Sequence, residues 1–295
     1  MNKKISILVG FSIAVMIVLY TQWFRSVDNE PRTSNVKTLH YQYILSNTTN
    51  RTIKNVAFYT FAPARKTAFQ RCVKIETSIP NQVVSDSLNN QVLQFKFNRF
   101  PPYGNKIISI SAVVEMFDRP TVAKLSESEK WLSPEKWVES EDQLIVEKTM
   151  MLKKNDPKNT ITALYHFVAG HISYSGYLRN ERGARYALVH RKGDCTEYAD
   201  LFTALCRAGG IPAKRVGGFI CRQADSRLAG NGYHNWTQVL VEKKWHVVDP
   251  QNRVFNVHPS DYIVMKIIGT HEDRFFPEFH RFKIEGDGIA VKMAS

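Results

Sequence analysis

The stretch that decides the fold is Lys192-Gly-Asp-Cys-Thr-Glu-Tyr-Ala-Asp-Leu-Phe-Thr-Ala-Leu-Cys-Arg-Ala-Gly-Gly-Ile-Pro-Ala213. Its apolar residues recur at helical spacing, and the repeating positions are Tyr198, Leu201, Phe202, Leu205 and Ala208. This pattern is typical of a helix that packs one face against a core. The helix is expected to end at Gly209-Gly210, because glycine favours the turn after a helix and Pro212 cannot continue it.

The start of this helix carries a candidate nucleophile. Asp194 and Glu197 have the spacing of a capping box, with aspartate in place of the usual serine or threonine. Cys195 is then the first helical residue, where the helix dipole and free backbone N–H groups favour the thiolate. The charge of Asp194 opposes this effect in part. A thiolate at neutral pH therefore also needs a base or a cationic partner.

A candidate base follows in the segment Gly232-Tyr-His-Asn-Trp236. His234 is expected to begin a strand, 234–242, directly after a glycine-rich turn. His246 is the competing histidine, but it alternates with apolar neighbours along the next predicted strand, which indicates a purely structural position. The other histidines of this region have no ligand partner at metal-binding spacing, and they are His166, His171 and His190.

The segment Trp245-His-Val-Val-Asp-Pro250 predicts a second strand, 245–248, that leads to Asp249 and stops at the proline. On neighbouring antiparallel strands the carboxylate of Asp249 and the imidazole of His234 can lie side by side. The start of the helix at Cys195 would face them. The three side chains then supply a nucleophile, a base and an orienting carboxylate.

In their order and spacing, the segments around Cys195, His234 and Asp249 resemble the transglutaminase-like superfamily of cysteine enzymes. The resemblance extends from about residue 157 to residue 253 and implies a papain-like α+β core with these three residues as the catalytic triad. Cys206 stands where an aliphatic residue is common in the family. The β-rich segment before the core also resembles the amino-terminal domain of some bacterial envelope proteins of this superfamily.

The resemblance implies a reaction at an amide bond through an acyl-thioester on Cys195. We expect a hydrolase, a peptidase or amidase acting on an envelope peptide or protein. The alternatives are transglutaminase-type acyl transfer, which cross-links proteins, and a non-catalytic module that binds peptide or assembles a complex. The backbone N–H of Cys195 would supply one oxyanion donor. Further candidates for oxyanion or substrate binding are Tyr174, Tyr186 and Trp236.

Hydrophobic periodicity divides the rest of the chain. Residues 36–118 alternate with period two between polar turns, which predicts an all-β, sandwich-like domain that serves binding or positioning. Residues 119–156 form a predicted helical connection, in which Ser140 and Gln143 have capping-box spacing. Residues 157–295 form the predicted catalytic domain, whose first helix begins at Asp156-Pro157 and whose last element is a hairpin, 280–285 with 289–293.

The first 35 residues predict a membrane anchor. Lys3 and Lys4 precede an apolar run from Ile5 that Trp23 and Phe24 close, and no small-residue cleavage site follows. Residues 1–25 are therefore expected to be an uncleaved signal anchor, with a cleaved signal peptide as the alternative. Residues 26–35 would be a polar linker. Either way the catalytic domain would be extracytoplasmic, for instance periplasmic, and the anchored form would span once with its amino end inside.

The composition of the 295 residues is that of a globular protein, with 43% hydrophobic and 23% charged residues. The net charge of +13 is spread evenly along the chain, and no nucleic-acid-binding motif accompanies it, so no nucleic-acid partner is expected. We expect a peptide or protein substrate, no cofactor and no metal. Four cysteines are too few for a disulfide scaffold. Any pairing among Cys72, Cys206 and Cys221 stays open.

Overall fold

The computed structural model describes residues 33–123, 128–178, 180–269 and 281–294. The predicted signal anchor, residues 1–25, lies outside this range, as does most of the predicted linker. The first strand begins at Thr33, three residues before the predicted start of the all-β domain at residue 36. In the described part of the chain, no helix has both the length and the apolar character needed to span a membrane.

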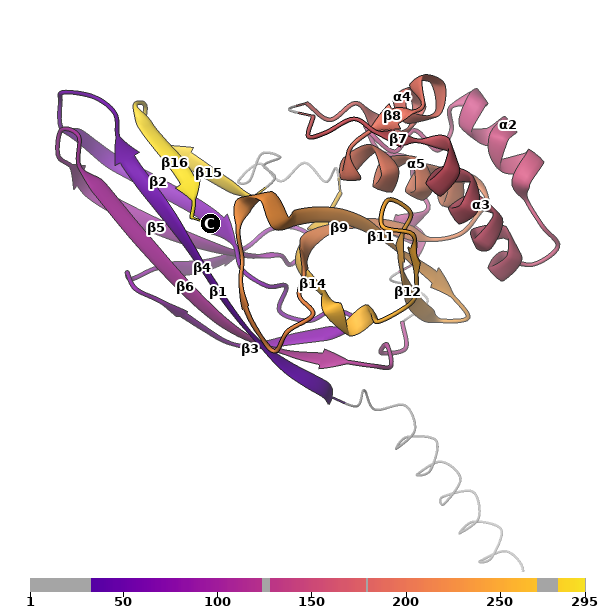
Figure 1. The fold of residues 1–295 in the computed structure, drawn as a ribbon, viewed down its shortest axis with the longest axis horizontal. Coiled ribbons are helices and arrows are strands. Elements are labelled where there is room, and N and C mark those ends of the chain that lie inside the picture. Colours follow the sequence, from indigo (N-terminus) through magenta and orange to yellow (C-terminus); the bar gives the residue numbers. More distant parts are fainter. Residues whose placement is uncertain (1–32, 124–127, 179, 270–280, 295) are drawn as a thin grey trace, which may run out of the picture.

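The amino-terminal half forms a sandwich of two sheets, which three short strands from later in the chain join (Figure 1). The first sheet contains β1 (Thr33–Asn47), β6 (Asn105–Phe117), β3 (Gln70–Thr77), β10 (Asp225–Arg227) and β16 (Ile289–Met293). The second contains β2 (Ile53–Phe61), β5 (Gln91–Phe100), β4 (Gln82–Ser85) and β15 (Phe282–Glu285). All pairs are antiparallel except that of β1 with β10. The alternating pattern of the sequence thus produces the expected two-layer β structure.

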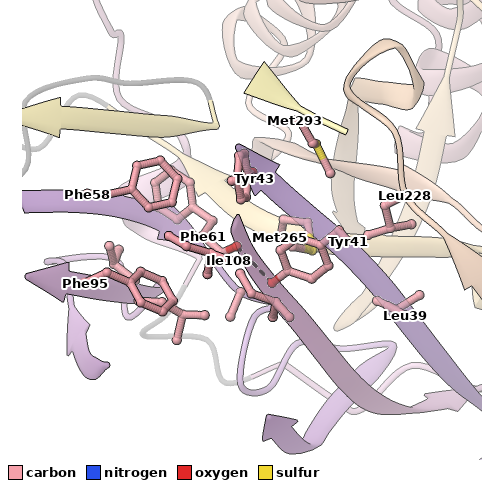
Figure 2. Packing of buried hydrophobic residues seen from close by; sticks show 14 of the residues in the cluster. Leu39, Tyr41, Tyr43, Phe58, Phe61, Phe95, Ile108, Leu228, Met265 and Met293 are labelled. Carbon is pink, nitrogen blue, oxygen red and sulfur yellow. Dashed lines mark hydrogen bonds between the residues drawn. The ribbon is translucent and has the colours of Figure 1, made fainter. Parts of the chain in front are cut away.

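The core of the sandwich is made of alternate residues from both sheets (Figure 2). Tyr43 on β1 and Phe58 on β2 are both buried, and their ring centroids lie 5.0 Å apart across the layers. The same cluster includes Met265 and Met293 from much later in the chain. The sandwich therefore does not enclose a core of its own, because residues beyond 118 complete it.

The second half combines helices with a five-stranded antiparallel sheet. The helices are α2 (Gln143–Leu152), α3 (Pro157–His171), α4 (Gly183–His190) and α5 (Cys195–Ala208). The sheet runs in the order β13 (Val254–Phe255), β12 (Lys244–Asp249), β11 (Tyr233–Val241), β9 (Ala213–Ile220) and β14 (Tyr262–Ile268). A short parallel pair, β7 (Ser173–Tyr174) with β8 (Lys192–Gly193), precedes α5. The whole is an α+β fold, as expected.

Local signals set the helix boundaries. The α5 helix begins at Cys195 and ends before Gly209, as predicted, and its length is buried between the other helices and the sheet. Asp156 caps α3 by accepting a hydrogen bond from the backbone N–H of Asn159. The cap of α2 differs from the prediction, because Asp142 rather than Ser140 accepts the backbone N–H of Leu144. A carboxylate directly before the first turn takes that N–H more readily.

The last two strands also differ from the prediction. They do not pair as a hairpin, because β15 pairs with β2 in one sheet and β16 pairs with β1 in the other (Figure 1). The turn predicted at Gly286-Asp-Gly288 is present, and both glycines have positive φ. However, the chain crosses there from one layer to the other. These strands were expected within the catalytic domain, 157–295, whereas their hydrogen bonds belong to the sandwich.

Candidate active site

The thiol of Cys195 lies at the first position of α5, where the capping box is formed. The Asp194 carboxylate accepts the N–H of Thr196 at 2.8 Å, and the Glu197 carboxylate accepts the N–H of Asp194 at 2.9 Å. A Cβ at Gly193 would lie 2.4 Å from the Cβ of Glu197, so only glycine fits before the cap. Cys195 is partly exposed, as an attacking thiol must be.

The imidazole of His234 and the carboxylate of Asp249 meet on neighbouring strands. The register of β11 and β12 pairs Thr237 with Val248, which makes His234 and Asp249 diagonal neighbours on one face. Nε2 of His234 lies 2.8 Å from Oδ2 of Asp249. The other ring nitrogen, Nδ1, is left for Cys195, with which the imidazole also shares a hydrogen bond.

Two further residues hold the carboxylate of Asp249, and neither was predicted from the sequence. Nδ2 of Asn252 lies 2.7 Å from Oδ2 of Asp249, and the hydroxyl of Tyr262 donates to the same oxygen at 3.0 Å. The amide of Asn252 also lies 3.0 Å from Nε2 of His234. An asparagine three residues after a strand-ending aspartate is a weak local signal of such a turn. Nothing in the local sequence indicates Tyr262.

These contacts favour the charged forms of the pair. Burial would lower the pKa of His234, but the hydrogen bonds and charges of Asp249 and Cys195 outweigh it and raise the pKa to about 9. Burial would likewise raise the pKa of Asp249, yet the hydrogen bond from His234 lowers it below its ordinary value. At neutral pH the site thus favours an imidazolium held by a carboxylate, next to a thiol at a helix N-terminus.

Trp236 supports the imidazole from behind. Its ring is fully buried, with its centroid 6.2 Å from that of His234 and the planes 19° apart. It also meets the ring of Tyr262 edge-on at 5.1 Å. Trp236 is not among the residues that line the adjoining cavity. The candidate role of Trp236 in substrate binding therefore has no geometric support, because the ring faces the protein interior.

A cavity of about 770 Å³ opens in front of Cys195 and His234. Its lining comes from the loop after β7, the start of α5, β11, the turn at 251–252 and the strands β15 and β16. Tyr174 lines this cavity and is 59% exposed. Tyr186 is not among its lining residues, since its ring packs against His190 on α4 with the Arg182 guanidinium over it. Of the two candidate tyrosines, only Tyr174 has access to the site.

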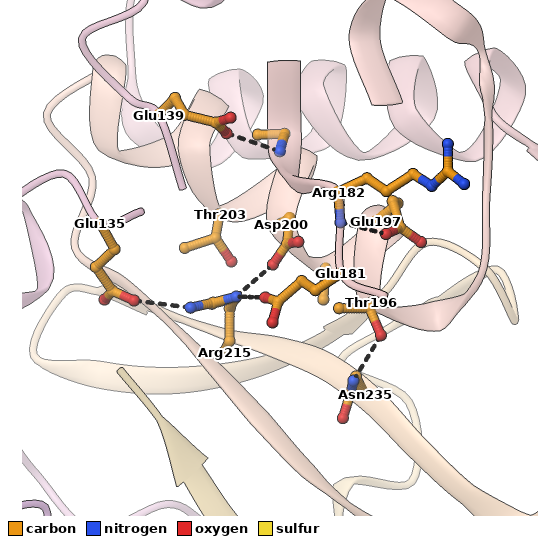
Figure 3. A network of polar contacts seen from close by, with 12 residues as sticks. Glu135, Glu139, Glu181, Arg182, Thr196, Glu197, Asp200, Thr203, Arg215 and Asn235 are labelled. Atoms are coloured by element: carbon orange, nitrogen blue, oxygen red, sulfur yellow. Dashed lines mark hydrogen bonds and ion pairs between the residues drawn. The ribbon is translucent and has the colours of Figure 1, made fainter. Parts of the chain in front are cut away.

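A buried charge network anchors one side of this cavity (Figure 3). The guanidinium of Arg215 on β9 forms ion pairs with Glu135, Glu181 and Asp200. Glu181 also lines the cavity, and the neighbouring backbone N–H of Arg182 donates to Glu197 at 3.1 Å. The network thereby ties the cavity-lining loop to α5, to the sheet and to the helical connection. In the described ranges, no group of three or more His, Cys, Asp or Glu side chains is arranged to hold a metal ion.

Comparisons with known proteins agree with this geometry. Residues 146–250 match the family model of the transglutaminase-like superfamily. Kyphoscoliosis peptidases from Mus musculus and Homo sapiens are 28% identical to this chain over 97 residues. That match covers 30% of this chain and only 15% of either relative.

One solved structure shares the fold over most of both chains. A protein from Cytophaga hutchinsonii, described as a candidate cysteine protease, superposes with a TM-score of 0.60 at 15% identity, over 88% of this chain and 91% of that one. The periplasmic domain of TgpA from Pseudomonas aeruginosa reaches a TM-score of 0.37 at 14% identity, over 70% and 92% of the two chains. At such identities the likeness concerns the fold alone. The segment of this chain from residue 146 to residue 250 is a transglutaminase-like superfamily domain.

Proposed function

We propose that this protein is a cysteine-dependent hydrolase that cleaves an amide bond of a peptide or protein. One observation carries the proposal. The thiol of Cys195, at a helix N-terminus, shares a 770 Å³ cavity with an imidazole that Asp249 holds at 2.8 Å. These are the parts that acyl transfer through a thioester requires.

The reaction would run in two halves. The thiolate of Cys195 attacks the substrate carbonyl carbon, and the oxyanion that forms accepts the backbone N–H of Cys195. The imidazolium of His234 gives its proton to the leaving amine as the C–N bond breaks. Water then attacks the thioester carbonyl carbon while His234 takes one of its protons, the C–S bond breaks, the thiolate of Cys195 is restored, and the acid product leaves. Asp249 keeps the ring oriented throughout, and Tyr174 is the candidate second oxyanion donor.

Hydrolysis competes with acyl transfer to an amine, in which an amine replaces water in the second half-reaction. The name peptidase, carried by the mouse and human relatives, supports the hydrolytic outcome. The part of the chain matched by them is short, so substrate identity does not follow from this likeness. Cross-linking by amine attack is the alternative outcome that an experiment must separate.

The test follows isotope from water into product. The full chain is incubated in H₂¹⁸O with a membrane and envelope protein extract, and the peptides are analysed by mass spectrometry. We expect new carboxyl termini that carry ¹⁸O and that the Cys195→Ala variant does not produce. New isopeptide bonds without ¹⁸O would show that the protein cross-links proteins and does not hydrolyse them. If the parent protein and the Cys195→Ala variant give the same peptides, the protein neither hydrolyses nor cross-links these substrates.

The location is part of the proposal. We propose that the amino-terminal segment anchors the protein in a membrane, with the catalytic domain outside the cytoplasm. The lysines at positions 3 and 4 and the apolar run after them support this orientation. Reporter fusions after residue 40 test it, one active only outside the cytoplasm and one active only inside. Activity of the inside reporter alone would contradict the proposed topology.

A further inference from the structure

A second cavity, of about 710 Å³, adjoins the one that contains the thiol. The two share three lining residues, Ile220, Gly232 and Asn252. The second cavity is otherwise lined by the end of β9, by the segment that leads into β10, and by residues 254–262. The segment before β10 runs down beside β1 (Figure 1), with which β10 pairs in parallel.

The second cavity is cationic. Its lining includes the basic side chains of Arg222, Arg227 and His258 and one carboxylate, that of Asp261, beside the uncharged thiol of Cys221 and phenol of Tyr262. The carboxylate of Asp261 is neutralised, because the buried ammonium of Lys37 lies 2.9 Å from it. Both arginines are exposed, and neither guanidinium forms a hydrogen bond or ion pair with the residues that the structure describes. The nearby carboxylate of Asp225 instead faces His40 at 3.4 Å.

The first cavity has a different charge pattern. Its lining includes three carboxylates, Glu181, Asp194 and Glu197, together with the cations Arg281 and Lys292 and the His234 imidazolium. A substrate that passes from the first cavity to the second therefore moves from mixed charge to an excess of positive charge. A segment with negative charge would be favoured more strongly in the second cavity, which has no unpaired carboxylate among its described lining residues.

The position of the second cavity relative to the imidazole assigns its part of the substrate. Cys195 lines only the first cavity, whereas Tyr262 lines only the second, and Asn252 lines both. Asn252 and Tyr262 contact Asp249, the partner of His234, and no residue of α5 lines the second cavity, so it opens from the His234 side of the first cavity rather than from the α5 side. The leaving amine must lie at Nδ1 of His234 to receive its proton, and therefore on the His234 side of the thiol. The chain attached to that amine is thus directed toward the second cavity, and the acyl part stays in the first.

We propose that the second cavity binds the leaving-group side of the substrate and selects segments that carry a carboxylate there. The carboxylate can be an Asp or Glu side chain or a free carboxyl terminus. This inference rests on the proposed function, because it assumes that an amide bond is cleaved at Cys195. It adds that the substrate is a polypeptide extending on both sides of the bond, with acidic character after it.

Direct binding tests the cavity without turnover. Two fluorescent peptides are titrated against the Cys195→Ala variant of the full chain and followed by anisotropy. One has an acidic carboxyl-terminal half, and the other has lysine at each of these acidic positions. We expect the acidic peptide to bind at least tenfold more tightly, with a preference that shrinks as salt is raised. Amidation of its carboxyl terminus separates a contribution of the terminal carboxylate from that of the side chains.

Charge reversal at the cavity provides the decisive comparison. The double variant Arg222→Glu/Arg227→Glu should lose the preference, and Arg222→Gln/Arg227→Gln should weaken it while changing the fold less. The matched control is Lys54→Glu/Arg99→Glu, which makes the same change in net charge on exposed strand residues that line neither cavity. The control should bind the acidic peptide within about twofold of the parent. Equal losses in both Glu pairs would refute the assignment and indicate a general charge effect.

Turnover separates this inference from the proposed function. With Cys195 intact, cleavage products of a random peptide library should be enriched in Asp and Glu after the cleaved bond. Cysteine-dependent cleavage with no such enrichment would overturn the inference and leave the hydrolase standing. Selective binding of the acidic peptide with no cysteine-dependent product would contradict the proposed hydrolase, and with it the leaving-group assignment, and would leave only the preference of the second cavity for acidic segments.

Discussion

The hydrogen bond between Nε2 of His234 and Oδ2 of Asp249, at 2.8 Å, leaves only Nδ1 of the imidazole facing Cys195. The carboxylate is 1% exposed and also accepts from Asn252 and Tyr262, so it cannot turn away from the ring. The proton on Nε2 is thereby fixed, and the proton on Nδ1 is the one available for transfer. This division of roles leads to the first three predictions.

Removal of the nucleophile or of its partner should stop turnover, and removal of the competing histidine should not. We expect Cys195→Ala to abolish activity and His234→Ala to be nearly as severe, because the thiolate loses its cation and the leaving group its proton donor. His246→Ala is the matched control and should retain kcat/KM within about threefold. His246 lies on β12 opposite Val239, outside the cavity. Equal losses at His234 and His246 would mean that the wrong histidine was chosen.

The pH dependence of activity should have an upper limit set by His234. Its pKa is raised to about 9, so the imidazolium is present below that pH and is lost as the pH rises through it. The contribution of this proton to the free energy of unfolding is likewise fully present below the ordinary histidine pKa of about 6.5. It is lost as the pH rises through about 9. In Asp249→Asn the raising partner is gone, and the fall in kcat/KM should move to lower pH by about one unit or more.

The same variant should lower kcat/KM by about 10- to 1000-fold at neutral pH. Loss of an orienting carboxylate cost about 10⁴-fold in a serine protease, whereas a thiolate is already a good nucleophile. The measurement is a pH–rate profile of both proteins on one substrate. If kcat/KM of Asp249→Asn falls at the same high pH as that of the parent protein, a group other than His234 controls this fall.

Asn252→Ala should reduce activity by about 3- to 30-fold, since one hydrogen bond that positions the Asp249–His234 pair is removed. A positioning role predicts that the upper pH limit shifts together with kcat while KM changes little. Asn256→Ala is the control, on the loop that follows β13, because among the described residues its side chain accepts a hydrogen bond only from the N–H of Val247. A rise in KM alone at Asn252→Ala would instead indicate a substrate contact.

Gly218→Ala should destabilise the fold by about 2–3 kcal/mol, which corresponds to a fall in Tm of roughly 5–10 °C. A Cβ at this position would lie 1.9 Å from the backbone oxygen of Ile263 on the neighbouring strand, and backbone cannot move aside cheaply. Gly170→Ala on α3 is the control, since nothing lies within 4 Å of its added Cβ. There alanine should raise Tm slightly, because it favours helix over glycine. If thermal melts give the same change in Tm for Gly218→Ala and Gly170→Ala, the packing argument is wrong.

The sequence predicted those parts of the site that depend on neighbouring residues. The capping box at Asp194, the helix start at Cys195 and the strand that ends at Asp249 all follow from patterns a few residues long. The expected strands 234–242 and 245–248 match β11 and β12 within one residue at each end. For the same reason His234 and Asp249 could be placed on neighbouring strands before their contact was known.

Contacts between distant segments were not predictable in this way. Tyr262 reaches Asp249 from β14, and no short pattern marks that approach. The turn between β15 and β16 was predicted correctly. However, the two strands pair with β2 and β1, which lie more than 200 residues earlier in the chain. Arg215 and Glu135 form an ion pair across 80 residues. Such pairings depend on the packed layers as a whole, which single-sequence periodicity does not describe.

The order in which the ribosome makes these elements has a consequence for control of the thiol. Cys195, His234 and Asp249 are synthesised before Phe282, Val291 and Met293, which line the cavity and fill the sheet edges. A nascent chain that already contains all three reactive side chains still lacks one side of its substrate cavity. The cavity in front of the thiol is therefore complete only when the strands that follow the core have paired with the first ones made.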